Sequence, residues 1–428
     1  MTKEIFPTHY ILQSVKSGQE FMDSGWSLDA PDEKEPTLVR AIYEEVQMTP
    51  KDNSFGLFRF ADWLPINRFL EGSSPPITYK SKGLAKELGL SNLYITFSGY
   101  FPEIGATMPT CSFKETEAYS VCARLREGNE DILVVASAGN TARAFARVCS
   151  DNKIPLLLCV PEDNLDALWF DKPISNCVKL YCTCSGSDYF DAINLSNNII
   201  GLPGFFAEGG AKNVARRDGM GTTVLSAVDF IKKIPDYYFQ AVGSGTGAIA
   251  AWEANQRLII DGRFGTNKMK LMVSQNDPFL PMYDAWKNNS REIVIKDDNE
   301  ARQQVEEICA KVLSNRKPPY SIAGGLYDAL KDTNGTILSA TNSQAADAAQ
   351  LFEKTEKIDI HPAAAIATAT LIKETAVGNI PKDAIIMLNI TGGGEKRFKQ
   401  DKKLYFLKPD YFFEINPTIK EIKEVIKK

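Results

Sequence analysis

Histidine is scarce in this sequence, and its cysteines do not form metal-binding pairs. Only two of the 428 residues are histidines, His9 and His361, and neither has a carboxylate and a nucleophile near it in the sequence. Ser-His-Asp catalysis, Cys-His catalysis and histidine-rich metal sites are therefore disfavoured. The eight cysteines include no Cys-x-x-Cys pair, and the tightest spacing is Cys182 to Cys184. We expect reduced thiols in a cytoplasmic protein with no bound metal.

Long hydrophobic runs and an excess of positive charge are also missing. The longest apolar run, at residues 154–160, is far too short to span a bilayer, and the first twenty residues lack the apolar core of a signal peptide. Lys and Arg total 49 against 54 for Asp and Glu, a net charge of −5. We therefore expect neither a membrane nor a nucleic acid as partner. Any anion that the protein binds must be met by a local site.

The distribution of apolar residues divides the chain into two parts. Residues 1–75 are irregular and predict an N-terminal extension or accessory segment. Residues 76–428 alternate short apolar runs, turn residues and helix-period segments, a pattern typical of β-α units and a mainly parallel sheet. Strands are predicted at 93–97, 132–136, 156–160, 179–182, 237–242, 270–273 and 384–390, and helices at 115–126, 142–151, 248–258, 344–354 and 362–375.

Ligands of open α/β sheets bind beyond the carboxyl ends of the strands, so the strand-to-helix turns are the places to search. The turn 109–115, Pro-Thr-Cys-Ser-Phe-Lys-Glu, places Lys114 at the start of a predicted helix. The positive end of the helix and desolvation beside Phe113 both weaken the preference of Lys114 for its charged form, which suits a lysine that binds a carbonyl group covalently. The alternative is an exposed lysine at a helix start.

The turn 137–141, Ser-Ala-Gly-Asn-Thr, offers small residues, backbone N–H groups and the amide of Asn140. These groups suit a carboxylate and a ring oxygen, although Asn140 and Thr141 could equally be ordinary helix N-caps. At the turn 391–396, Thr-Gly-Gly-Gly-Glu-Lys, the Thr391 hydroxyl could meet a ring nitrogen while the glycines leave room for a flat ligand. The alternative there is a flexible turn.

A glycine-rich turn follows the predicted strand 237–242. Residues 243–248, Gly-Ser-Gly-Thr-Gly-Ala, let the backbone approach and hold a phosphate at a helix N-terminus. They also satisfy G-x-G-x-x-A with Asp261 eighteen residues after Gly243, so a dinucleotide site is an alternative. The absence of Gly-Lys-Ser/Thr excludes a Walker A loop. Together, the four turns describe a pocket for pyridoxal phosphate.

In this order, PTCSFK, SAGNTARAF, VGSGTG and TGGG resemble the fold type II pyridoxal-phosphate family that contains threonine synthase and cysteate synthase. Longer blocks, ITYKSKGLAKELGLSNLYI, TCSFKETEA, EGGAKNVARRDGMGT, YFQAVGSGTGAIAAWEA and PPYSIAGGLYDAL, are more similar to the cysteate synthases. Where threonine synthases usually have Asp-Arg after the lysine, this chain has Glu115-Thr116. The resemblance implies an α/β, tryptophan synthase β-like fold of two open parallel-sheet lobes with pyridoxal 5'-phosphate between them.

The resemblance also implies roles for individual residues. Lys114 is the catalytic residue that binds the cofactor, Asn140 holds the ring oxygen and Thr391 meets the pyridine nitrogen. The cofactor phosphate lies against Gly243, Ser244, Gly245, Thr246 and Gly247. The substrate contacts are expected at Ser137, Gly139 and Thr141 for the amino-acid carboxylate and at Asn213 and Arg216 for phosphate or sulfite; Lys212 and Arg217 are left open.

The implied activity is β-replacement on O-phospho-L-serine by sulfite, giving L-cysteate and phosphate in a homodimer. The alternatives are a threonine synthase acting on O-phospho-L-homoserine, a nicotinamide-dependent oxidoreductase and a non-catalytic homologue. One departure from the resemblance concerns the N-terminus. Cysteate synthases of methanogens begin with a Cys-x-x-Cys stretch, whereas residues 14–17 here read Ser-Val-Lys-Ser, so no zinc is expected.

Overall fold

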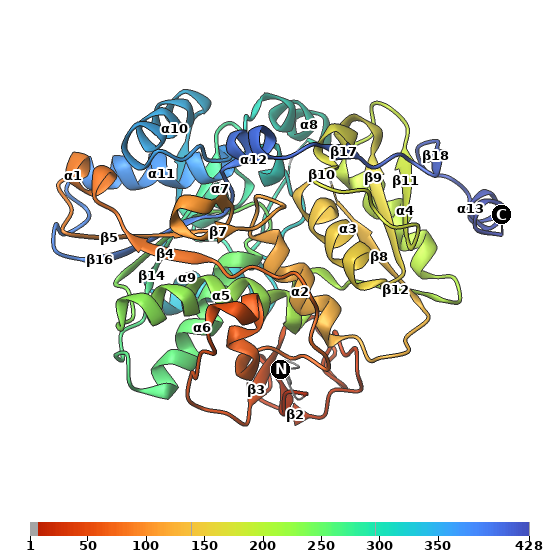
Figure 1. Cartoon of the computed structure of the whole chain (residues 1–428), viewed down its shortest axis with the longest axis horizontal. Helices are drawn as coiled ribbons and strands as arrows, with labels where there is room; N and C mark the ends of the chain where they lie inside the picture. Colours follow the sequence, from red (N-terminus) through yellow and green to blue (C-terminus); the bar gives the residue numbers. More distant parts are fainter. Residues whose placement is uncertain (1–6, 138, 296, 428) are drawn as a thin grey trace.

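The computed structural model describes residues 7–137, 139–295 and 297–427, and it contains two large parallel sheets side by side (Figure 1). The larger sheet has six strands in the order β15-β14-β13-β16-β5-β4, all parallel except β4, which runs antiparallel to β5. The strands are β4 (Ile77–Lys80), β5 (Asn92–Phe97), β13 (Tyr237–Ala241), β14 (Lys270–Asn276), β15 (Thr336–Ala340) and β16 (Ile385–Ile390).

The smaller sheet has five strands, all parallel, in the order β12-β8-β9-β11-β18. Its central strand β9 is buried at every position, because other parts of the protein cover both faces of a parallel sheet. The two-lobed α/β architecture predicted from the sequence is therefore confirmed. The strands are β8 (Ile132–Ala136), β9 (Leu156–Pro161), β11 (Val178–Thr183), β12 (Phe205–Ala207) and β18 (Tyr411–Phe413).

Helices cover both faces of the larger sheet. One face packs against α5, α6 and α9, and the other against α10 and α11. In the smaller lobe, α3 and α4 lie on opposite faces, in two separate apolar clusters. The helices are α1 (Gly83–Leu88), α2 (Lys114–Arg124), α3 (Asn140–Asn152), α4 (Tyr189–Ile200), α5 (Val214–Ile231), α6 (Thr246–Asp261), α7 (Pro281–Lys287), α8 (Asp298–Glu307), α9 (Leu326–Asp332), α10 (Asn342–Glu356), α11 (Pro362–Ala376), α12 (Glu395–Asp401) and α13 (Ile419–Ile426).

Helix α5 is the largest element that the sequence pattern did not predict. It packs between α2 and α6, and nearly all of its first fifteen residues are buried, including Arg217 and Asp218. A helix enclosed on all sides has no polar face, so it lacks the periodicity by which amphipathic helices are found. Gly219 lies where a β-carbon would be 2.4 Å from the backbone oxygen of Thr116, so the glycine allows α5 and α2 to approach closely.

Arg217, whose role the sequence left open, is a structural residue. Its side chain is fully buried and donates to Glu253 at 2.8 Å and to the backbone oxygens of Val39 and Ala211. It therefore joins α5 and α6 to the N-terminal segment, and it does not line the central cavity.

The N-terminal segment forms its own antiparallel sheet in the order β2-β1-β3, beneath α5 and α6 in Figure 1. Its strands are β1 (Tyr10–Ser14), β2 (Glu20–Phe21) and β3 (Val39–Tyr43), and residues 1–6 lie outside the described residues. Thr37 pairs with Ala323 of the larger lobe, and Leu38 reaches the central cavity. Ser14 ends β1 and its hydroxyl donates to Glu33 at 2.7 Å, so the turn 14–17 is held by hydrogen bonds between polar side chains and backbone.

Four short strands complete the fold: β6 (Tyr100–Phe101) pairs with β7 (Ala106–Thr107), and β10 (Trp169–Phe170) pairs with β17 (Tyr405–Phe406). In the parts of the chain that the structure describes, no helix combines the length and apolar character needed to cross a membrane.

Candidate active site

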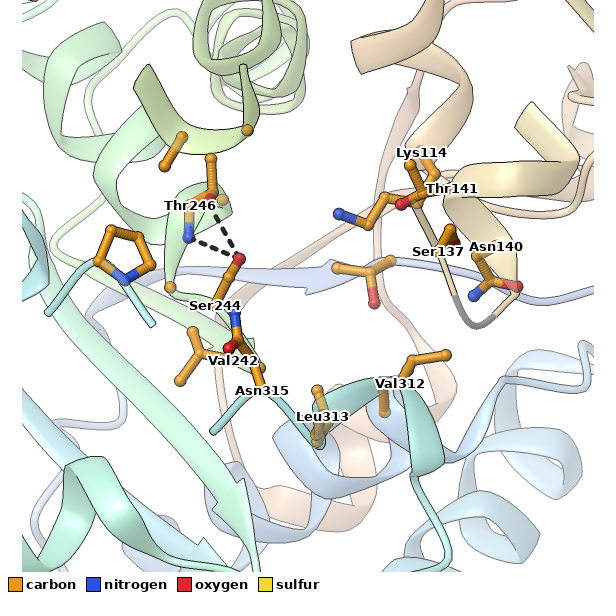
Figure 2. Close-up of a pocket in the computed structure, with 18 of the residues that line it drawn as sticks. Lys114, Ser137, Asn140, Thr141, Val242, Ser244, Thr246, Val312, Leu313 and Asn315 are labelled. Atoms are coloured by element: carbon orange, nitrogen blue, oxygen red, sulfur yellow. Dashed lines mark hydrogen bonds between the residues drawn. The ribbon is translucent and has the colours of Figure 1, made fainter. Parts of the chain in front are cut away.

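A cavity of about 460 Å³ lies where the carboxyl ends of β8, β13 and β16 meet the start of α2. Twelve of the thirteen site residues predicted from the sequence line this cavity, and Asn213 is the exception. Residue 138, within the predicted turn 137–141, lies outside the described residues. Figure 2 shows Lys114 and Asn140 on one side of the cavity and Ser244 and Thr246 on the other.

Lys114 is the first residue of α2, and its side chain is about one-fifth exposed. Its Nζ atom lies 3.1 Å from Oε2 of Glu117 and 5.0 Å from the centre of the Phe113 ring. Burial, the largest cause, and the charge of Arg216 lower the pKa of Lys114, while Glu117 opposes them. A lysine with a lowered pKa has a larger fraction of neutral, nucleophilic amine near neutral pH.

The amide of Asn140, at the start of α3, is oriented by a buried arginine. Arg143 donates to Oδ1 of Asn140 at 2.9 Å, and its other N–H groups donate to the backbone oxygens of Thr110 and Ala167. Its guanidinium also lies 4.0 Å from the ring centre of Trp169. Because Oδ1 is engaged, Nδ2 of Asn140 faces the cavity as a donor (Figure 2).

Two of the predicted substrate contacts near α3 have structural partners. The Ser137 hydroxyl accepts from the N–H groups of Gly139 at 3.2 Å and Ala142 at 3.0 Å, and so it caps α3. The Thr141 hydroxyl donates to Oε1 of Glu117 at 3.1 Å. Gly139, also in the cavity wall, has a φ of 154°.

The glycine-rich turn after β13 forms a tight backbone loop that leads into α6. Gly245 is the N-cap with a φ of 80°, and a β-carbon there would lie 2.9 Å from Cδ2 of Leu326. A β-carbon on Gly243 would lie 2.8 Å from the backbone oxygen of Val312. The hydroxyls of Ser244 and Thr246 are 2.9 Å apart across the loop (Figure 2). This loop can receive a phosphate on the N–H groups of the helix start.

The dinucleotide alternative is not supported by the position of Asp261. This residue ends α6, about 22 Å along the axis from the helix start, so it cannot reach a nucleotide held at the loop. Its carboxylate instead accepts from the N–H of Met48 at 2.7 Å and from Arg263.

Thr391 follows β16, and its backbone oxygen accepts from the N–H of Phe113 at 2.9 Å. Gly393 similarly donates to the backbone oxygen of Cys111 at 3.1 Å. The Thr-Gly-Gly-Gly turn therefore packs directly on the turn that carries Lys114. A β-carbon on Gly392 would lie 2.3 Å from Nδ1 of His361, so the turn also requires small residues.

Asn213, predicted as a substrate contact, does not line the cavity. It is the N-cap of α5 and is fully buried. Its Oδ1 accepts from the N–H of Ala215 at 3.0 Å and from Arg124 at 2.9 Å, and its Nδ2 donates to the backbone oxygen of Glu208 at 2.7 Å. These bonds engage both ends of the amide and fix the start of α5.

Arg216 reaches the cavity but already has two carboxylate partners. Its Nε and Nη2 donate to Glu117 at 3.1 and 2.7 Å, and its Nη1 donates to Glu208 at 2.9 Å. Glu117 and Glu208 do not line the cavity and were not singled out in the sequence. The only sequence signal for Glu117 is its spacing of three residues from Lys114, which places both on one face of a helix.

The charge of the cavity wall differs from that of the chain. Five cationic side chains line it, and among the described residues no Asp or Glu does so. Two of the five, Lys311 and Lys317, come from the segment after α8, which contains none of the predicted site motifs. The five are Lys114, Lys212, Arg216, Lys311 and Lys317.

His361 lies at the edge of the cavity as the N-cap of α11, with Nε2 3.1 Å from Oε2 of Glu395. Burial raises the pKa of Glu395, but contacts with His361 and Lys399 outweigh burial and lower it to about 2. No role was predicted for His361, and its carboxylate partner becomes visible only in the fold.

Glu115, next to Lys114, makes stability depend on pH. Its carboxyl group is buried, and burial raises its pKa to about 7 despite hydrogen bonds from Thr110 that lower it. The folded state thus holds a proton that the unfolded chain releases above its ordinary pKa near 4.5, so this residue's contribution to stability falls as pH rises from about 4.5 to 7. We expect Glu115→Gln to gain stability relative to the natural chain over this window, by an amount on the order of 3 kcal/mol by pH 8.

Urea unfolding followed by circular dichroism at pH 5 and pH 8 measures this difference. Glu353→Gln, which alters a half-exposed carboxylate, is the control and should show no such growth with pH. A gain in the free energy of unfolding of Glu115→Gln that is equal at both pH values would contradict the prediction.

Comparison with protein families and curated proteins places these motifs in context. A family model described as pyridoxal-phosphate dependent enzyme matches residues 81–392. Cysteate synthase of Methanosarcina barkeri is 48% identical over 402 residues, covering 94% of this chain and 96% of that protein. Cysteate synthase of Methanospirillum hungatei is 46% identical over 403 residues, covering 94% of each.

Solved structures with low sequence identity share the fold. Maize serine racemase matches with a TM-score of 0.57 and 13% identity, covering 76% of this chain and 92% of that one. The processed form of threonine deaminase isoform 2 from Solanum lycopersicum matches with a TM-score of 0.57 and 16% identity, covering 89% of this chain and 95% of that one.

Proposed function

Because the chain belongs to the cysteate synthase family of pyridoxal-phosphate dependent enzymes, we propose that it forms L-cysteate and phosphate from O-phospho-L-serine and sulfite. The observation that carries this choice of substrates is the charge of the cavity. An acidic chain lines its cavity with five cationic side chains and, among the described residues, no carboxylate. Phosphoserine and sulfite are both anions. Lys114 and Arg216 are paired with Glu117 and Glu208, and Lys212 with Asp29, so Lys311 and Lys317, which have no carboxylate partner among the described residues, supply the unpaired positive charge that attracts these anions.

The cavity residues fit the cofactor. The loop 243–247 approaches so closely that a β-carbon on Gly243 or Gly245 would collide with its neighbours, which suits a backbone that holds a phosphate group. Nδ2 of Asn140 is a donor suited to a ring oxygen, and the Thr391 hydroxyl suits a pyridine nitrogen. Lys114 would bind the cofactor covalently. When bound, pyridoxal phosphate supplies an electron sink that makes the Cα hydrogen of an amino acid acidic.

The chain's own residues perform the remaining tasks. Lys114 removes the Cα proton at Nζ and returns it after the replacement. The bond from Cβ to the ester oxygen breaks and phosphate leaves with the electron pair, and the sulfur lone pair of sulfite forms the new bond to Cβ. N–H groups of the turn 137–141 receive the substrate carboxylate, and Lys311 and Lys317 attract the two anions.

Two further features belong to this proposal. The eight cysteines are all free thiols, which supports the expected cytoplasmic location. The family resemblance supports a homodimer.

A competition assay tests the substrate assignment. The purified protein, loaded with pyridoxal phosphate, receives equal concentrations of O-phospho-L-serine and O-phospho-L-homoserine together with sulfite, and mass spectrometry identifies the products. We expect cysteate and an equal amount of released phosphate. Threonine would contradict the assignment and favour a threonine synthase, whose substrate differs by one methylene, a difference worth only ~1–3 kcal/mol in pocket discrimination.

A further inference from the structure

Glu117 is a buried carboxylate in contact with Lys114, and the reaction described above gives it no task. Its side chain has no exposed surface. Its Oε2 lies 3.1 Å from Nζ of Lys114 and accepts from Nε of Arg216, while its Oε1 accepts from Nη2 of Arg216 and from the hydroxyl of Thr141. Each carboxylate oxygen therefore has two partners, and three elements, α2, α3 and α5, supply them.

The charged side chains around Lys114 balance one another. Two cations, Lys114 and Arg216, contact two carboxylates, Glu117 and Glu208, so the group is neutral when all four are ionised. Removing one charge from a buried set leaves its partner uncompensated, which is costly. The other titratable groups facing Lys114 or lining the same cavity wall are Tyr189 at the start of α4, His361 at the start of α11, and the cavity lysines.

The protonation state of Glu117 follows from these contacts. Burial alone raises the pKa of Glu117, but Arg216 and Lys114 outweigh burial and leave the pKa below its ordinary value. Glu208, which shares Arg216 through a single contact, has a pKa raised by burial. Glu117 is thus an ionised acceptor, and it does not compete with Lys114 for the proton.

We propose that Glu117 is a positioning residue for Lys114, which holds Nζ at the cavity wall and stabilises its protonated form while Arg216 keeps Glu117 ionised. This inference rests on the proposed role of Lys114. Between removing and returning the Cα proton, Lys114 is a buried ammonium, and such a charge requires a fixed counter-charge. Arg216 accordingly acts on the catalytic lysine through Glu117.

The test measures the pKa of Lys114 in the full-length chain freed of cofactor. The chain is labelled briefly with acetic anhydride across a pH series, and mass spectrometry follows acetylation of the peptide that contains Lys114. Loss of an opposite charge at this distance lowers a lysine pKa by about 1 to 3, so Glu117→Gln should label Lys114 about tenfold faster or more at neutral pH. Glu117→Asp keeps the charge on a shorter side chain, so its rate of Lys114 acetylation should lie between those of Glu117→Gln and the natural chain.

One further variant completes the experiment. Glu353→Gln, which removes the carboxylate partner of the surface Lys396, is the matched control and should leave the Lys114 profile unchanged. Glu117→Asp keeps the carboxylate, so the proposal stays testable against the natural chain if Glu117→Gln does not fold. A Glu117→Gln profile equal to the natural one, an aspartate variant no different from the glutamine variant, or an aspartate profile equal to the natural one would overturn the proposal.

These readouts separate the inference from the proposed function. The labelling needs neither substrate nor cofactor, so a failed competition assay leaves its result intact. Conversely, an unchanged labelling profile removes the role of Glu117 and leaves the identity of the products to the assay.

Discussion

Replacing Lys114 by alanine is expected to abolish turnover and to remove covalent attachment of the cofactor. In the proposed reaction the amine of Lys114 both binds pyridoxal phosphate and carries the Cα proton, and among the described lining residues no other lysine starts a helix against the Thr391 turn. General acid-base catalysis alone contributes about 10² to 10⁴ in rate, so phosphate release should fall by about 10³-fold or more. Borohydride reduction followed by peptide mass spectrometry should find the cofactor on Lys114 in the natural chain and on no lysine in the variant.

The control for this change is Lys396→Ala, because Lys396 pairs with Glu353 at the surface of α12 and α10. Its turnover and its reducible cofactor should match those of the natural chain. A Lys114→Ala protein that retained both turnover and a reducible bond to the cofactor would remove Lys114 from the reaction.

Gly245→Ala is expected to weaken cofactor binding strongly. At a φ of 80° a β-carbon costs about 1–2 kcal/mol, and here it would also lie 2.9 Å from the buried Leu326. The loop can relieve both only by moving the N–H groups that are proposed to hold the phosphate, and each hydrogen bond to a charged group is worth about 1.5–3 kcal/mol. The dissociation constant for pyridoxal phosphate, measured by fluorescence titration, should rise about 10- to 100-fold.

Gly262→Ala is the matched control for this prediction. Gly262 is the C-cap of the same helix, with a φ of 75°, and a β-carbon there would meet only the backbone oxygen of Ile260, at an ordinary contact distance of 3.9 Å. The variant should lose comparable conformational stability and keep its affinity for the cofactor. If both variants bind the cofactor as tightly as the natural chain, the loop 243–247 does not hold the phosphate.

Much of the fold could be predicted from the sequence because local patterns specify parallel β-α units. Apolar runs such as 132–136 and 156–160 are long enough for a buried strand and end in turn residues, and both are strands in the structure. The predicted helices differ from the observed ones only at their ends. The helix α5 was missed because it is surrounded by protein and therefore has no polar face to reveal its period.

Part of the candidate site could likewise be predicted from the sequence, and part could not. Ligands of open α/β sheets bind beyond the carboxyl ends of the strands, so Lys114, Asn140, the loop 243–247 and Thr391 could be assigned to one pocket from the sequence, although β8 belongs to one sheet and β13 and β16 to the other. The N-cap role of Asn213 could not be predicted, because an N-cap and a ligand contact use the same amide, and its partners Arg124 and Glu208 become visible only in the fold.

By itself the sequence determined the family and predicted which turns form the cofactor pocket and which lysine reacts, because these inferences depend on short runs of consecutive residues. The tertiary structure alone decided how the charges are paired. Glu117 and Arg216 stand 99 residues apart, and their contact exists because α2 and α5 pack closely at Gly219. The tertiary structure also brings Leu38 of the N-terminal segment to the cavity and places Asp261 at the far end of α6. Sequence spacing fixes neighbours within a helical turn, whereas partners on different elements are fixed only by how those elements pack.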